Sequence, residues 1–324
     1  MRNQAENRRD STAAEVVTAD ASRELECPIC GDASVHAEPA PNWGEWRRCV
    51  TCTLEFTNPR RLPDRPEVVF QGAYTGNRFE SGFYDFRKLL NKREALIETP
   101  NLWYWTPAYP QVLDWLTKRL PRGATVLELG CGPGFFLHAM RREGFDAVGL
   151  DVAEVTVEKN RKDGFRVWHG TLDTMPPDWV RADAIVVFFI MHHLENPLEL
   201  LKSIKTRWPH SPLAVAQYGP GSKDPVRGAP PRNLTRWNSV SMGTAFRTAG
   251  YSPKVLDLPS SGGERRIFGT IREILRPTMA VPWLYRFNKR IERRLLPKMM
   301  KPLSQEAEVI LTFGEPKETG SLPK

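Results

Sequence analysis

From residue 121 onward, short apolar runs alternate with stretches in which apolar residues recur every three or four positions. The runs predict strands buried on both faces, and the second pattern predicts amphipathic helices. The expected strands are Thr125–Leu129, Ala147–Leu150, Arg166–Trp168, Ala184–Phe189, Leu213–Tyr218 and Lys254–Leu258. The expected helices are Phe135–Glu143, Val152–Lys162, Pro197–Arg207 and Val240–Ala249. Such alternation predicts an α/β fold with a parallel sheet wound on both sides.

The region before residue 121 follows other patterns. Residues 1–24 are polar and charged, and their composition predicts a disordered tail. Residues 25–60 are expected to contain short strands, at Trp46–Arg48 and Leu54–Thr57. Residues 61–120 begin with a linker rich in proline and arginine and are then mostly helical, with many aromatic residues. This segment is expected to pack against the next domain, and covering a substrate pocket is the alternative.

Two further elements are expected after the alternating region 121–270, in residues 271–324. Apolar residues recur at helical spacing between 283 and 301, and basic residues fill the opposite side. This basic amphipathic helix is predicted to pack on its own protein, with an anionic membrane surface or an acidic partner as the alternative. A late strand at Glu308–Phe313 is expected to complete the sheet.

The first strand ends in a glycine-rich turn, VLELGCGPG, at residues 126–134. Such a turn between a strand and a helix brings bare backbone N–H groups against a polar ligand. The third glycine of a dinucleotide fingerprint would fall at position 135, which is phenylalanine. Asp151 ends the next strand about 20 residues further on, where a ribose-binding carboxylate is expected. The spacing therefore favours a ribose-containing ligand other than NAD.

This stretch resembles the first motif of class I S-adenosylmethionine-dependent methyltransferases, in which a hydrophobic strand ends in an acid followed by alternating glycines. The resemblance implies a Rossmann-like, doubly wound, mostly parallel seven-stranded sheet whose late strand is antiparallel. It implies that the glycines face the methionine part of S-adenosylmethionine, that Glu128 holds its ammonium group and that Asp151 binds the ribose. The cofactor-binding residues implied are Glu128, Gly130, Cys131, Gly132, Gly134, Asp151, Val152, Leu172, Asp173 and Phe189. From the residues themselves, the Cys131 side chain is interpreted as packing and Asp173 equally as an ordinary turn acid.

Four of the five cysteines form two pairs, Cys27 with Cys30 and Cys49 with Cys52. This spacing is typical of a four-cysteine zinc site, in which two turns each supply two thiolates. The segment is too short to build its own core, so a structural Zn²⁺ is expected to stabilise it as a zinc ribbon. A redox pair or an iron–sulfur site is the alternative. A substrate-facing or nucleic-acid-binding role for the ribbon stays open beside simple stabilisation.

The fourth strand leads into FFIMHHLENP at 188–197. This resembles the motif after the fourth strand in ubiquinone-type and zinc-ribbon-bearing methyltransferases, and His193 matches their histidine. His193 is the candidate base and His192 the second candidate, since imidazole titrates near neutral pH. Lining the pocket is the alternative role. A second resemblance, at 230–251, has Asn233 where relatives carry histidine, which leaves that loop as a substrate wall.

The net charge of +8 permits attraction to RNA, anionic lipid or acidic substrates without selecting one. Residues 1–20 lack the apolar stretch of a signal peptide. The longest apolar run has eight residues, against roughly 20 for a membrane span. A cytoplasmic location is therefore expected.

The sequence predicts an S-adenosylmethionine-dependent methyltransferase that acts on a small-molecule acceptor, with O-methylation as the leading reaction. An RNA methyltransferase that uses the zinc ribbon for RNA binding is the alternative, because the ribbon and the basic charge both suit RNA. A non-catalytic zinc-ribbon binding module on a degenerate methyltransferase fold is the third hypothesis.

Overall fold

A computed structural model describes residues 26–40, 44–75, 90–91, 93–98, 106–221, 230, 233–259 and 307–317. The expected tail at 1–24 and the expected basic helix at 283–301 lie outside the described residues, as do all the aromatic residues between 76 and 105. Within the described ranges, no helix is both long and apolar enough to cross a lipid bilayer.

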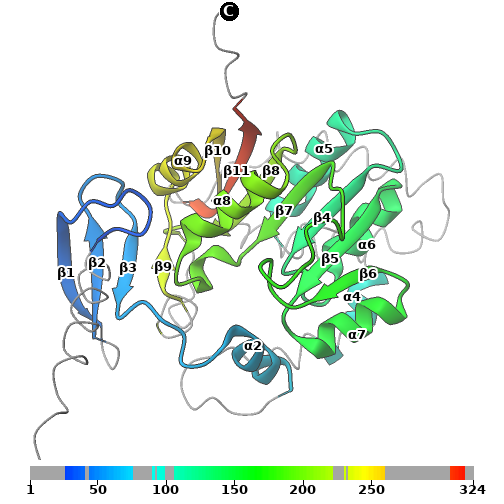
Figure 1. Cartoon of the computed structure of the whole chain (residues 1–324), viewed down its shortest axis with the longest axis horizontal. Coiled ribbons are helices and arrows are strands. Elements are labelled where there is room, and N and C mark those ends of the chain that lie inside the picture. The colour runs from blue at the N-terminus through cyan, green and yellow to red at the C-terminus, as the bar shows by residue number, and fades with distance from the viewer. Residues whose placement is uncertain are drawn as a thin grey trace, which may run out of the picture.

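The larger sheet is the mostly parallel, seven-stranded sheet that the sequence predicts (Figure 1). Its strands, in spatial order, are β10 (Tyr251–Pro259), β11 (Ala307–Pro316), β8 (Leu213–Tyr218), β7 (Ala184–Phe188), β4 (Thr125–Leu129), β5 (Asp146–Asp151) and β6 (Arg166–His169). The five strands from β8 to β6 are parallel, and β11 inserts antiparallel between β8 and β10. The α/β, Rossmann-like fold class is thereby confirmed, including the late antiparallel strand.

Helices cover both faces of this sheet. One face packs against α5 (Ala108–Arg119), α6 (Phe135–Glu143) and α7 (Glu154–Lys162), and the other against α8 (Pro197–Arg207) and α9 (Ser239–Thr248). Alternate residues of β4 show the division. Val126 packs in the core under α5, α6 and α7, whereas Leu127 and Leu129 pack in the core under α8 and α9. The carboxyl ends of the parallel strands are therefore left as the edge at which a ligand is expected.

The cysteine segment forms a second, antiparallel sheet in the order β1 (Val35–Ala40), β2 (Gly44–Cys49), β3 (Glu55–Asn58) and β9 (Thr235–Arg236). Two of these strands, β1 and β9, were not expected from the sequence. The segment does not stand alone, because Leu54 and Phe56 are buried in the same core cluster as Trp237 and Met242 of the large domain. It therefore shares a core with the domain that it precedes.

The described residues of 61–120, which the sequence predicts to be mostly helical, form two helices besides α5. They are α2 (Pro66–Thr75) and α4 (Arg93–Glu98). In Figure 1, α2 lies below the gap between the small sheet and the large one. The side chain of Gln71 in α2 accepts a hydrogen bond from the Val155 N–H, so α2 lies against the start of α7.

Candidate active site and metal centre

The glycine turn joins β4 to α6, and its conformation requires glycine. Gly130, Gly132 and Gly134 all have positive φ angles, of 69°, 47° and 80°. A Cβ on Gly130 would lie 2.0 Å from Ile190 Cδ1, and one on Gly134 would lie 2.0 Å from Asn160 Oδ1. The expected turn geometry is therefore present.

The role expected for the N–H groups of this turn is wrong. The N–H groups of Gly130 and Cys131 donate to the Leu150 carbonyl at 2.7 and 3.0 Å, and that of Gly134 donates to the Cys131 carbonyl. The Gly132 N–H donates to Asp151 Oδ2 at 2.7 Å. These donors stabilise the junction of β4 and β5, so they do not face a ligand bare. The Cys131 side chain is buried in the core, which matches its interpretation as packing.

Glu128 is a carboxylate buried in β4, immediately before the turn. It is 2% exposed, and its Oε2 has no hydrogen-bond partner among the described residues. Burial, and then the negative charge of Asp151, raises the pKa of this carboxyl well above its usual value. A buried acceptor without a donor is costly unless a cation or donor arrives. The site therefore fits the ammonium group of S-adenosylmethionine.

Asp151 ends β5 and is 7% exposed. Its Oδ1 accepts hydrogen bonds from the Ala153 N–H at 2.9 Å and the Thr156 hydroxyl at 3.2 Å, while Oδ2 holds Gly132. Burial raises the pKa of this carboxyl, and these hydrogen bonds oppose the rise. A carboxylate has about four lone-pair positions, so it can also accept from ribose hydroxyls.

A cavity of about 370 Å³ opens beside Asp151, between α2 and the ends of β5 and β6. Its lining residues are Glu67, Val68, Gln71, Gly72, Val152, Glu154 and His169. Val152, one of the residues expected to bind the cofactor, lines this cavity together with residues of α2. Leu172 is buried in the core, and Asp173 is exposed. The roles of these residues stay predictions.

Aromatic rings gather where β7 ends. Phe189 has a positive φ of 57° and stacks on Tyr218 at a centroid distance of 4.5 Å. His193 meets Phe70 of α2 edge-on at 5.1 Å. His192 is buried, and its Nδ1 lies 2.6 Å from Gln217 Oε1 in β8. A single glutamine in an apolar strand was the sequence signal for this partner, and the sequence interpretation missed it.

The loop before α9 connects this region to the cysteine sheet. The Leu234 N–H donates to the His192 carbonyl at 2.7 Å, and the Leu234 carbonyl accepts from the Thr57 N–H of β3 at 2.9 Å. Asn238 caps α9, and its amide also donates to the Thr53 carbonyl at 3.0 Å. The loop expected to form a substrate wall is therefore held between His192 and the second cysteine turn.

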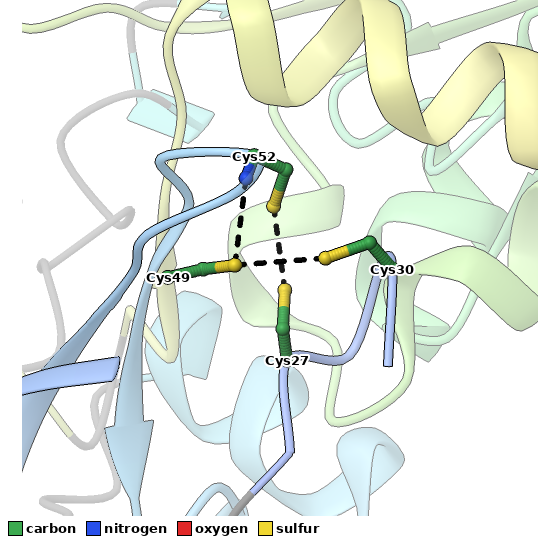
Figure 2. Close-up of side chains that lie close together, drawn as sticks. All are labelled: Cys27, Cys30, Cys49 and Cys52. Carbon is green, nitrogen blue, oxygen red and sulfur yellow. Dashed lines mark hydrogen bonds between the residues drawn. The ribbon is translucent and has the colours of Figure 1, made fainter. Parts of the chain in front are cut away.

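The four paired cysteines meet at one point, as Figure 2 shows. Their Sγ atoms all lie within 4.8 Å of one another, with 3.4 Å between Cys27 and Cys52 and 3.5 Å between Cys30 and Cys49. Four thiolates around Zn²⁺ at 2.3 Å would be about 3.8 Å apart. The Cys52 N–H points to Cys49 Sγ at 3.4 Å, and all five cysteines of the chain are free thiols. The cluster therefore fits a tetrahedral zinc site.

Comparisons with known proteins give relatives that match about a third of the chain. A ribosomal protein L11 methyltransferase from Cupriavidus taiwanensis is 32% identical over 109 residues, which cover 32% of this chain and 36% of the relative. A ubiquinone biosynthesis O-methyltransferase from Xylella fastidiosa is 27% identical over 116 residues, covering 30% of this chain and 47% of the relative. The chain thus spans between a third and a half of the length of these curated relatives.

Among solved structures, a SAM-dependent methyltransferase from Archaeoglobus fulgidus is similar, with 17% identity and a TM-score of 0.40 over 64% of this chain and 94% of that one. The match to a family model is more direct. Residues 104–218, which contain the glycine turn, Asp151 and both candidate histidines, match the model of a methyltransferase domain. The resemblance stated from the glycine turn is thereby confirmed, and residues 104–218 belong to this family of methyltransferase domains.

Proposed function

We propose that the chain is an S-adenosylmethionine-dependent methyltransferase that acts on a small-molecule acceptor, with O-methylation as the reaction. The observation that carries the proposal is the buried Glu128 carboxylate, whose Oε2 is without a partner among the described residues and lies beside the glycine turn. In a fold that had lost its ligand, a buried carboxylate with a raised pKa at this position would cost stability without serving binding.

The residues of the crevice would divide the work as follows. Glu128 holds the ammonium group and Asp151 the ribose, while the turn from Gly130 to Gly134 gives the methionine part close access to the backbone. S-adenosylmethionine, when bound, supplies a methyl group on a sulfonium, which passes to a nucleophile by in-line displacement. His193 accepts the proton of an acceptor hydroxyl, and the aromatic walls align that hydroxyl and exclude water.

A small acceptor suits the enclosure at the end of β7 better than RNA does. Phe70 of α2 closes one side of this region, and the stacked rings of Phe189 and Tyr218 form another. Between residues 26 and 58 the chain has five acidic residues and only two arginines, and no lysine. An RNA-binding face would need an excess of positive charge. One relative is named for ribosomal protein L11 and another for ubiquinone biosynthesis, so the relatives do not select the acceptor.

The decisive experiment supplies the purified chain with methyl-labelled S-adenosylmethionine and separated fractions of a cell extract. We expect label in the fraction of small metabolites. Label confined to RNA, with an affinity that falls steeply with salt, would favour the RNA hypothesis. Absence of cofactor binding would favour the non-catalytic module.

We further propose that the four cysteines hold one structural Zn²⁺. The supporting observations are the tetrahedral spacing of the sulfurs and the burial of Cys27, Cys49 and Cys52. With four protein ligands no coordination position is left for a substrate, so the metal takes no part in the reaction. The helix expected at 283–301, its packing on its own protein, and the alternative of an anionic surface or acidic partner all stay predictions.

Replacing Glu128 by glutamine is expected to weaken S-adenosylmethionine binding by roughly 10- to 100-fold, the equivalent of about 1.5–3 kcal/mol for a charged hydrogen bond. Because the pKa of Glu128 is raised, binding of the ammonium group releases a proton, and the affinity of the wild type rises with pH by up to about tenfold per pH unit. Calorimetry in two buffers of different ionisation enthalpy measures that proton release, which the variant should lose.

The same raised pKa gives the opposite trend for stability. The folded chain binds this proton more tightly than the unfolded chain, so the contribution of Glu128 to stability is present at low pH and is lost as pH rises through the folded pKa. The Glu128→Gln variant should therefore lose less stability than the wild type as pH rises. Glu158→Gln, an exposed glutamate of α7, is the matched control and should behave as the wild type. Equal affinities in both variants would remove Glu128 from the cofactor site.

Replacing Asp151 by alanine should lower both stability and cofactor affinity. The change removes the acceptors of Gly132, Ala153 and Thr156, and we expect a loss of about 2–4 kcal/mol in the free energy of unfolding. Affinity for S-adenosylmethionine should fall at least tenfold, about 1.4 kcal/mol. Thr156→Val removes one of these donors but keeps the carboxylate, so it should lose stability without losing affinity. An Asp151→Ala protein that binds as tightly as the wild type would exclude the ribose role.

A further inference from the structure

Behind the glycine turn, on the side of α4 and α7, lies a buried polar cluster that no part of the site described above uses. Its centre is the side chain of Arg93, which is 1% exposed. Arg93 lies at the start of α4, before the residues that match the family model. A buried arginine is rare unless its guanidinium is fully engaged, so its partners indicate what it holds.

The guanidinium reaches the turn directly. Its Nε donates to the Pro133 carbonyl at 2.7 Å. Its Nη2 donates to Asn160 Oδ1 at 3.0 Å and to Asp163 Oδ2 at 2.5 Å. Arg93 therefore ties one carbonyl of the glycine turn to two residues at the end of α7.

Asn160 carries the contact one residue further along the turn. It is fully buried, and its Nδ2 donates to the Gly132 carbonyl at 2.8 Å. The orientation of its amide is set from both ends, because Oδ1 accepts from Arg93 while Nδ2 faces a carbonyl. The missing Cβ of Gly134 would lie 2.0 Å from this same Oδ1. The amide thus fills the space that glycine leaves open at the back of the turn.

Asp163 anchors the cluster. Its Oδ2 also lies 2.9 Å from His138 Nε2 of α6, and its backbone carbonyl accepts from Arg141 at 2.8 Å. Two consecutive peptide carbonyls, those of Gly132 and Pro133, are therefore held from one side by side chains fixed to α4, α6 and α7. The Gly132 N–H is held from the other side by Asp151.

We propose that Arg93 is a positioning residue for cofactor binding: with Asn160 it fixes the two peptide planes of the turn that wraps the methionine part of S-adenosylmethionine. The inference rests on the proposed function. Arg93 touches no reacting group, so its loss should raise the dissociation constant of the cofactor and leave the rate at saturating cofactor nearly unchanged. Arg93 couples α4 to the cofactor turn, although α4 lies outside the residues that match the family model.

The test compares two arginines at the contact between α4 and α6, Arg93 of α4 and Arg142 of α6. Arg142 of α6 donates to the Ile97 carbonyl of α4, so Arg142→Gly loosens α4 without touching the turn. Arg93→Gly is expected to weaken binding of S-adenosylmethionine, measured by calorimetry, at least tenfold, whereas Arg142→Gly should lower the melting temperature and leave the affinity within twofold. Millimolar guanidinium should restore affinity to Arg93→Gly, and methylammonium should not. Only a planar guanidinium can donate to the Pro133 carbonyl and to Asn160 Oδ1 at the same time.

Arg93→Lys serves if the glycine variant does not fold. Lysine keeps a charge near Asp163 but cannot bond Pro133 and Asn160 together in the same geometry, so it should fold and still bind the cofactor at least tenfold more weakly. The inference would be overturned, without affecting the proposed function, if Arg93→Lys or Arg93→Gly bound the cofactor as tightly as the wild type. Equal weakening of binding in Arg142→Gly would have the same consequence. A wild-type chain that does not bind S-adenosylmethionine would overturn the proposed function, and this inference with it.

Discussion

Removal of zinc is expected to lower the melting temperature of the chain by roughly 10 °C and to disorganise the substrate wall. Structural zinc sites contribute about 10–16 kcal/mol to the stability of small folds. A third of this free energy would lower the melting temperature of a domain of this size by roughly 10 °C. The cysteine turns also share a buried core with Trp237 and Met242 of the large domain. Loss of the metal should therefore be felt beyond the small sheet.

The measurement is zinc content and thermal unfolding of the wild type, of the chelated protein and of Cys52→Ser. The wild type should contain one zinc per chain. Thr51→Ala is the control, since Thr51 lies in the same turn without contributing a sulfur. The Michaelis constant of the acceptor should rise more than the dissociation constant of the cofactor, because Asn238 and Leu234 link the cysteine sheet to the wall and to His192. A wild type without zinc, or one whose stability is unchanged by chelation, would contradict the assignment.

Replacing His193 by alanine is expected to reduce kcat by about 10²- to 10⁴-fold, the usual contribution of a general base. The side chain lies just after β7, against the ring of Phe70. Binding of S-adenosylmethionine should be unchanged, because Glu128 and Asp151 are intact. The measurement is steady-state kinetics with the identified acceptor across a range of pH.

His36→Ala in the exposed part of β1 is the matched control and should retain wild-type activity. His192→Ala should differ from both, since loss of its bond to Gln217 inside the core lowers stability as well as rate. If His193→Ala raises only the Michaelis constant of the acceptor and keeps kcat, then His193 lines the pocket and is not the base.

Local patterns were sufficient for most strands and helices of the large domain, whereas the antiparallel late strand was implied by the family resemblance. The strand Thr125–Leu129 and the helices Phe135–Glu143 and Pro197–Arg207 have the bounds that the sequence predicts. Each is short and strongly patterned, with glycine or asparagine next to at least one of its ends, so neighbouring residues largely determine its limits. The cysteine cluster was predictable for the same reason, since its ligands are paired within each turn.

Long-range pairing was not predictable from local patterns. The two-residue strand β9 exists because Thr235 and Arg236 pair with β3, almost 180 residues earlier in the chain. Likewise, nothing near Arg93 distinguishes it from an exposed arginine, and its partners lie up to 70 residues away. Such contacts depend on the completed fold.

The glycine turn shows a subtler limit. Its spacing correctly indicated a sharp turn, but the N–H groups expected to face a ligand are used by Leu150, Cys131 and Asp151. A motif specifies the path of the backbone more securely than it specifies which of its polar groups stay free.

The most direct test of Glu128 as the ammonium ligand is a calorimetric titration of the 324-residue chain with S-adenosylmethionine, repeated with Glu128→Gln. We predict one binding site per chain, with release of a proton in the wild type and weaker binding in the variant. No detectable binding to the wild type, or binding that the variant leaves unchanged in both affinity and proton release, would contradict it.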